Sequence, residues 1–187
     1  MSLAKSVIPE CYVDSCLFNV LLKFEKEGVN HTKGNATVVK KVEEKFNDLF
    51  CVAIIDKDKR DIDFLTRECD RVELEGLGNY FTFFKRRDKS HYFIQIVPAV
   101  EEWIMKVAND LEIDLSQTDL KVSSLEELKK LSKKIESKND ERFKSLFRTF
   151  VKKSEEKNYV PVVKLRNTIL YLLDKTYQAD IKELINA

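Results

Sequence analysis

The chain has 187 residues, of which 43% are hydrophobic and 35% charged, a balance typical of a globular protein rather than a disordered one. Its net charge is +1, but residues 121–187 contain 16 Lys and Arg against 10 Asp and Glu. This excess of positive charge suits nucleic-acid binding, and ordinary exposed lysines on helices are the alternative explanation. No apolar run reaches membrane-spanning length and no signal peptide opens the chain, so we expect a cytoplasmic protein without membrane contact. The cysteines show no CxxC pairing, so a zinc site is not expected.

The first third of the chain predicts short strands alternating with helices. Residues 3–9 form a weak strand candidate that Pro9 stops. From Tyr12 the apolar residues recur in helical steps until Gly28. Residues 29–31 make a short second strand at best, and Asn35 or Thr37 is expected to cap the helix that follows. In the first helix, Asp14 lies where an acid favours the helix dipole.

The strand from Phe50 to Ile55 is the strongest signal in the sequence. It is apolar and rich in β-branched residues, which is typical of a strand buried on both faces, and it ends in Asp56-Lys57-Asp58. Ligands in open α/β sheets bind beyond the carboxyl ends of strands, and alternation points both acids to one side. Two such carboxylates predict a Mg²⁺ site, with a solvated turn as the alternative.

The next segment predicts a helix over residues 61–69, an irregular stretch over residues 70–78, and two strands, Asn79–Arg86 and His91–Val97. The two strands form a hairpin, or the second rejoins the parallel sheet. After Pro98, a helix is expected over residues 99–111, with acids in its first turn.

The C-terminal third predicts helices joined to the rest by a linker at residues 113–122. Ser124 begins a capping box, and Asn139 or Asp140 caps a second helix. Two more helices follow, over residues 162–177 and 179–185. We therefore expect an α/β domain over residues 1–115 and a helical subdomain over residues 120–187, packed together because isolated helices of this length are marginal.

Two basic residues, His31 and Lys33, precede the second predicted helix. If the strands are parallel, they lie at the same sheet edge as Asp56 and near a bound phosphate. A simple polar loop is the alternative.

The order of these features resembles the Toprim domain, the Mg²⁺-binding module of topoisomerases, primases and overcoming-lysogenization-defect nucleases. The resemblance covers roughly residues 5–110. PECYVD at residues 9–14 is similar to the first acidic motif of the family, and IIDKDKRD at residues 54–61 is similar to its DxD motif. It implies a Rossmann-like, mostly parallel sheet.

The resemblance also implies roles for individual residues. Glu10 would be the catalytic acid or base, and Asp56 and Asp58 would hold Mg²⁺ or Mn²⁺. Glu101 or Glu102 would match the further Glu of nuclease-type members; the acids would hold one metal ion or two, and with two this Glu would complete the second site. Phosphates would be anchored by the basic residues of the two loops, Lys33, Lys57, Lys59 and Arg60.

Two functions remain open at this level. The first is a metal-dependent nuclease acting on DNA or RNA. The second is an inactive Toprim-like module that binds nucleic acid or a protein partner, which Cys11 favours because the family usually has Gly there. A phosphate-sensing receiver-like domain is a more distant third. The sequence does not predict the choice between DNA and RNA, the pathway or the oligomeric state.

Overall fold

The computed structural model describes residues 2–57 and 62–186, and its described part contains a five-stranded mixed sheet. The strands occur in the order β1-β2-β5-β4-β3, and β2 is parallel to both of its neighbours, β1 and β5. Strand β4 is antiparallel to β5 and to β3. The predicted hairpin and the predicted return to the parallel sheet are therefore both present. The bounds are β1 Val7–Pro9, β2 Cys51–Asp56, β3 Cys69–Val72, β4 Phe81–Arg86 and β5 His91–Ile96.

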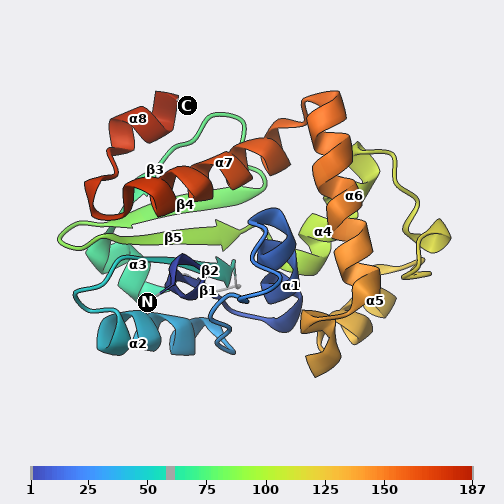
Figure 1. Cartoon of the computed structure of the whole chain (residues 1–187), viewed down its shortest axis with the longest axis horizontal. Helices are drawn as coiled ribbons and strands as arrows, with labels where there is room; N and C mark the ends of the chain where they lie inside the picture. The colour runs from blue at the N-terminus through green and yellow to red at the C-terminus, as the bar shows by residue number, and fades with distance from the viewer. Residues whose placement is uncertain (1, 58–61, 187) are drawn as a thin grey trace.

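Helices cover both faces of the sheet, as Figure 1 shows, with α7 crossing one side and α2 lying on the other. The helices are α1 Tyr12–Leu21, α2 Asn35–Lys45, α3 Asp63–Glu68, α4 Val100–Asp110, α5 Leu125–Ser132, α6 Glu141–Lys157, α7 Val160–Lys175 and α8 Ile181–Asn186. Short 3-10 turns are η1 Leu3–Ser6, η2 Leu115–Gln117, η3 Ile135–Lys138 and η4 Thr176–Gln178. No helix in these residues has the length and apolar character needed to cross a bilayer.

Alternation along β2 divides the core into two layers. Val52 and Ile54 face the larger layer, which includes residues of α1, α4, α6 and α7. Ala53 and Ile55 face the smaller layer with α2 and α3. All four side chains are fully buried, which explains why β2 is apolar along its whole length instead of alternating with polar residues.

The C-terminal helices share the larger layer with the sheet. Trp103 of α4 packs against Phe81 of β4, with ring centroids 5.7 Å apart, and against Phe150 of α6, at 6.2 Å. Leu165 of α7 belongs to the same apolar cluster. Burial of these large rings holds α6 and α4 against the sheet, because each ring removes a large apolar area from water, and Leu165 joins α7 to the same cluster.

Several local expectations are wrong. Residues 3–6 form a 3-10 turn, and β1 is confined to its three apolar residues. Helix α1 ends at Leu21, well before Gly28, because Lys23 adopts a left-handed conformation with φ 59°. Gly34, not Asn35 or Thr37, is the N-cap of α2. The stretch expected to be irregular from residue 70 contains most of β3, in which Cys69 and Val72 are buried while Asp70 and Arg71 are exposed.

The predicted cap at Ser124 gives a test of the local structure. Its hydroxyl accepts a hydrogen bond from the Glu127 N–H at 3.3 Å, while the Glu127 carboxylate accepts from the Ser123 N–H at 2.8 Å. We expect Ser124→Ala to lower the free energy of unfolding by about 0.5–2 kcal/mol, because the orphan N–H loses its partner. Urea unfolding measures this. Ser123→Ala, the matched control, should change little, and equal losses in both variants would contradict the capping role.

Candidate acidic site at the ends of β1 and β2

The parallel pairing of β1 with β2 brings Glu10 to Asp56. Pro9 is opposite Ile54 in the register, so Glu10 follows β1 at the level where β2 ends. The Glu10 carboxylate, through Oε2, accepts a hydrogen bond from the Asp56 N–H at 3.0 Å. Two acids that are 46 positions apart in sequence therefore meet at one edge of the sheet.

Asp56 links the end of β2 to the start of α4. Its Oδ1 accepts a hydrogen bond from the Val100 N–H at 3.1 Å, so this carboxylate serves a helix N-terminus whose own N-cap, Ala99, has no side-chain oxygen. Burial raises the pKa of Asp56 to about 10, and the negative charges of Asp14, Glu10 and Glu101 contribute to the rise. A carboxyl in this position gives up its proton readily only if a positive charge approaches.

Asp14 adds a fully buried carboxyl to the group. Its Oδ2 accepts from the Cys11 N–H at 3.2 Å, and the Cys11 Sγ accepts from the Asp14 N–H at 3.3 Å, which makes a capping box at the start of α1. The Asp14 Oδ1 is buried and has no hydrogen-bond partner among the described residues. Burial raises the pKa of Asp14 to about 7, with the charges of Glu10 and Glu101 also raising it.

The two glutamates that open α4 have different surroundings. Glu101 acts electrostatically on both Asp14 and Asp56, and its Oε1 accepts a hydrogen bond from the Ser132 hydroxyl at 2.5 Å. Glu102 forms an ion pair with Lys129 of α5 at 2.9 Å. The structure therefore brings Glu101 into the acidic group, while the charge of Glu102 is balanced by Lys129.

The acidic group thus comprises Glu10, Asp14, Asp56 and Glu101. Within residues 2–57 and 62–186, no three or more His, Cys, Asp or Glu side chains are arranged to hold a metal ion together. Asp58, the second acid of the DxD motif, lies outside the described residues. These crowded carboxylates, of which Asp14 and Asp56 have raised pKa values, could bind a cation, because it would offset their mutual repulsion, or could hold a proton for transfer.

The predicted phosphate-binding residues fall in three places. Lys33 is exposed in the loop before α2, and Lys57 is exposed directly after β2. Lys59 and Arg60 lie outside the described residues. His31 is partly buried, and its Nδ1 lies 3.2 Å from the carbonyl oxygen of Cys11, the residue that follows Glu10.

Two residues near the site were not predicted from the sequence to belong to it. Asn35 is buried, and its Nδ2 donates to the carbonyl oxygen of Asp56 at 3.0 Å, which ties the start of α2 to the end of β2. Lys41 donates to the Asn30 Oδ1 at 2.7 Å and to the Thr32 Oγ1 at 2.5 Å, which fixes the loop before α2. The sequence does not indicate this role for either residue, because an Asn before a helix predicts an N-cap and a Lys on a helix predicts an exposed side chain.

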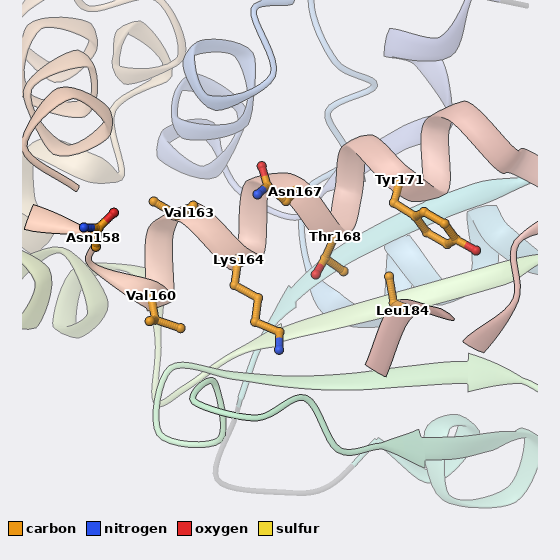
Figure 2. A pocket seen from close by; sticks show the side chains of 8 residues that line it. All are labelled: Asn158, Val160, Val163, Lys164, Asn167, Thr168, Tyr171 and Leu184. Atoms are coloured by element: carbon orange, nitrogen blue, oxygen red, sulfur yellow. The ribbon is translucent and has the colours of Figure 1, made fainter. Parts of the chain in front are cut away.

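A pocket of about 390 Å³ lies elsewhere, between α7 and α8. Figure 2 shows its lining side chains, with Tyr171 of α7 and Leu184 of α8 at one end and Val160 at the other. It contains Lys164 but no carboxylate, and none of its residues belongs to the acidic group. The largely apolar walls do not provide the charged groups that phosphodiester chemistry requires.

Comparison with protein-family models, with curated proteins and with solved structures found no match for this chain.

Proposed function

We propose that this protein is a Mg²⁺- or Mn²⁺-dependent nuclease-like enzyme that hydrolyses phosphodiester bonds in DNA or RNA. The convergence of Glu10, Asp56 and Glu101 with the buried Asp14 is the observation on which the proposal rests. A Rossmann-like, Toprim-type body is part of the same proposal. Its support is the parallel set β1, β2 and β5 with helices on both faces.

The carboxylate chemistry of the acidic group would suit a hard divalent cation. Mg²⁺ takes carboxylate oxygens and retains several waters, so a few acids on one side of the ion are sufficient. Asp56 and Glu101 would hold the ion together with Asp58, and the unpartnered Oδ1 of Asp14 would face the added positive charge. When bound, the ion would supply charge neutralisation of the phosphate and activation of the attacking water. Glu102 would take part only after its ion pair with Lys129 opens.

The protein side chains would perform the remaining tasks. Glu10, at the boundary of β1 and α1, would accept a proton from the attacking water or return one to the leaving oxygen. The backbone hydrogen bond from Asp56 fixes its orientation. Positive charges at the loops would position the phosphates, which is the proposed role of Lys33, Lys57, Lys59 and Arg60.

Cleavage of labelled single-stranded and double-stranded DNA and RNA tests the proposal. We expect products with Mg²⁺ or Mn²⁺ and none with EDTA. Cleavage with EDTA present would contradict metal dependence. Absence of cleavage with either metal, on all four substrates, would instead support the inactive binding module.

The second function has its own support. The described residues contain no complete set of three metal ligands, and Cys11 blocks the close backbone approach that a Gly would allow. An inactive module would bind DNA or RNA without requiring Mg²⁺, because binding would depend on its lysines alone.

The different surroundings of Glu101 and Glu102 lead to a prediction on metal affinity. We expect Glu101→Gln to weaken Mg²⁺ binding by about 10-fold or more, because the change removes a charge from the acidic group. Glu102→Gln should weaken it less, since Lys129 already balances that charge. Isothermal titration with Mg²⁺ measures both constants. Equal effects of the two variants would contradict the assignment of Glu101.

A further inference from the structure

A stacked aromatic pair lies beside the acidic group. The rings of Tyr12 and His31 have centroids 4.4 Å apart and are inclined by only 22°. Tyr12 begins α1, two residues after Glu10, and both rings are partly exposed. The Ser15 hydroxyl donates to the Cys11 carbonyl at 2.8 Å, so the His31 Nδ1, 3.1 Å from that hydroxyl, is placed as a donor. The two rings are therefore held in a fixed stack.

Lysines from separate segments surround this pair. Lys41 reaches the loop that contains His31, with its Nζ 3.5 Å from the His31 carbonyl oxygen. Lys33 follows His31 in the same loop, and Lys138 comes from η3, which packs on α1. Burial lowers the pKa of His31, and the charges of Lys138, Lys41 and Lys33 lower it further.

Lys41 lies among like-charged side chains. Burial, Lys45 and Lys138 together lower the pKa of Lys41, so the lysines repel one another. In the part of the chain that is described, none of the ion pairs includes Lys33, Lys41, Lys45 or Lys138. Like charges gathered from a loop, a helix and a 3-10 turn are unfavourable unless an anion lies among them.

We propose that the Tyr12–His31 pair and the lysines around it bind single-stranded nucleic acid. One base stacks on the aromatic pair, and Lys33 and Lys138 contact the flanking phosphates. Aromatic rings within a basic surface are the usual means of holding single strands, whereas the bases of a duplex are stacked on each other and unavailable. The inference rests on the proposed function, and it means that the substrate would reach Glu10 as a single strand.

Binding is measured by fluorescence anisotropy with a labelled single strand of about 15 nucleotides, a length near the site sizes of single-strand binders, and with a duplex of equal length. The buffer contains EDTA, so that any cleavage is absent. We expect Tyr12→Leu to weaken single-strand binding at least about fivefold, because a stacked base contributes about that much or more. Tyr12→Phe keeps the ring and should bind like the wild type.

The lysines are tested by the dependence of affinity on salt. Each phosphate contact to a single strand contributes about 0.7 to the slope of log K against log salt, so Lys33→Ala with Lys138→Ala should reduce it by about 1.4. Lys152→Ala with Lys182→Ala, on α6 and α8, makes the same change in net charge and should leave the slope unchanged. Circular dichroism verifies that each variant is folded.

The inference fails if duplex binds as tightly as single strand and Tyr12→Leu has no effect, or if both lysine pairs reduce the slope equally. Single-strand binding in EDTA without cleavage in Mg²⁺ would support this inference while contradicting the nuclease. Metal-dependent cleavage would support the nuclease, and if Tyr12→Leu changed neither affinity nor rate, this inference would be contradicted.

Discussion

Replacing Asp56 with Asn should abolish metal-dependent cleavage and at the same time make the metal-free protein more stable. Loss of a ligand charge should reduce activity by at least about 100-fold, since even groups that only orient metal ligands contribute about 10- to 100-fold. The side chain keeps its size, and an amide oxygen can still accept the hydrogen bond from the Val100 N–H. Initial rates with Mg²⁺ and thermal unfolding in EDTA measure the two effects.

The gain in stability follows from the acids around Asp56. Glu10, Asp14 and Glu101 all raise its pKa, and burial raises it most, so its ionised form is unfavourable without a cation. The Asn amide is neutral and can donate a hydrogen bond toward the remaining carboxylates. At pH 8 in EDTA we expect a gain of at least about 1 kcal/mol, or about 2–4 °C in Tm for a chain of this size.

Asp119→Asn is the matched control, because Asp119 is exposed in the segment between α4 and α5. It should leave both the cleavage rate and the Tm within experimental error. If Asp56→Asn instead lowers the Tm and the wild type cleaves no substrate, Asp56 is a structural residue that caps α4, and the binding module becomes the better description.

The core of the fold was predictable because its signals are local. The apolar run of β2 needs burial on both faces, and the structure places this strand between two parallel neighbours. The hairpin of β4 and β5 and the cap at Ser124 also follow from nearby residues. Strand β3 was missed because its pairing with β4 depends on backbone hydrogen bonds and not on an apolar pattern.

The candidate site was harder to predict from the sequence than the fold. The approach of Glu10 to Asp56 follows once β1 and β2 are neighbours, but the depth of Asp14 does not, because the first turn of a helix is usually solvated. The choice between Glu101 and Glu102 depends on where α5 places Lys129, a contact across 27 positions. Such long-range contacts are set by packing, which single-sequence patterns do not contain.

Without metal, the protein should lose stability as the pH rises from about 7 to about 8.5, and Mg²⁺ should restore it. The folded pKa of Asp56 is raised to about 10, whereas an unfolded Asp has a pKa of about 3.9. A group with a raised folded pKa stabilises the protein fully below the unfolded value, and this contribution is lost as the pH rises toward the folded value. The pKa of Asp14 is raised to about 7, so most of the stability that depends on its proton is already lost below this window.

Other groups change little between these pH values. The lowered pKa values of His31 and His91 affect stability below their ordinary value of about 6.5, and the raised pKa values of buried thiols such as Cys51 act above about 8.5. Asp56 therefore contributes most of the slope, up to about 1.4 kcal/mol per pH unit or about 2 kcal/mol over the window.

Differential scanning calorimetry in EDTA should show a fall in Tm of about 4–8 °C over this window. Mg²⁺ should reverse the fall, and more strongly at the higher pH, because the ion competes with the proton for the same carboxylate oxygens. Asp56→Asn should remove most of the slope and the response to Mg²⁺, while Asp119→Asn should keep the slope and the response. A Tm that stays constant or rises with pH in EDTA would show that the carboxyl of Asp56 ionises normally in the folded protein, and the acidic group would then have no need of a cation.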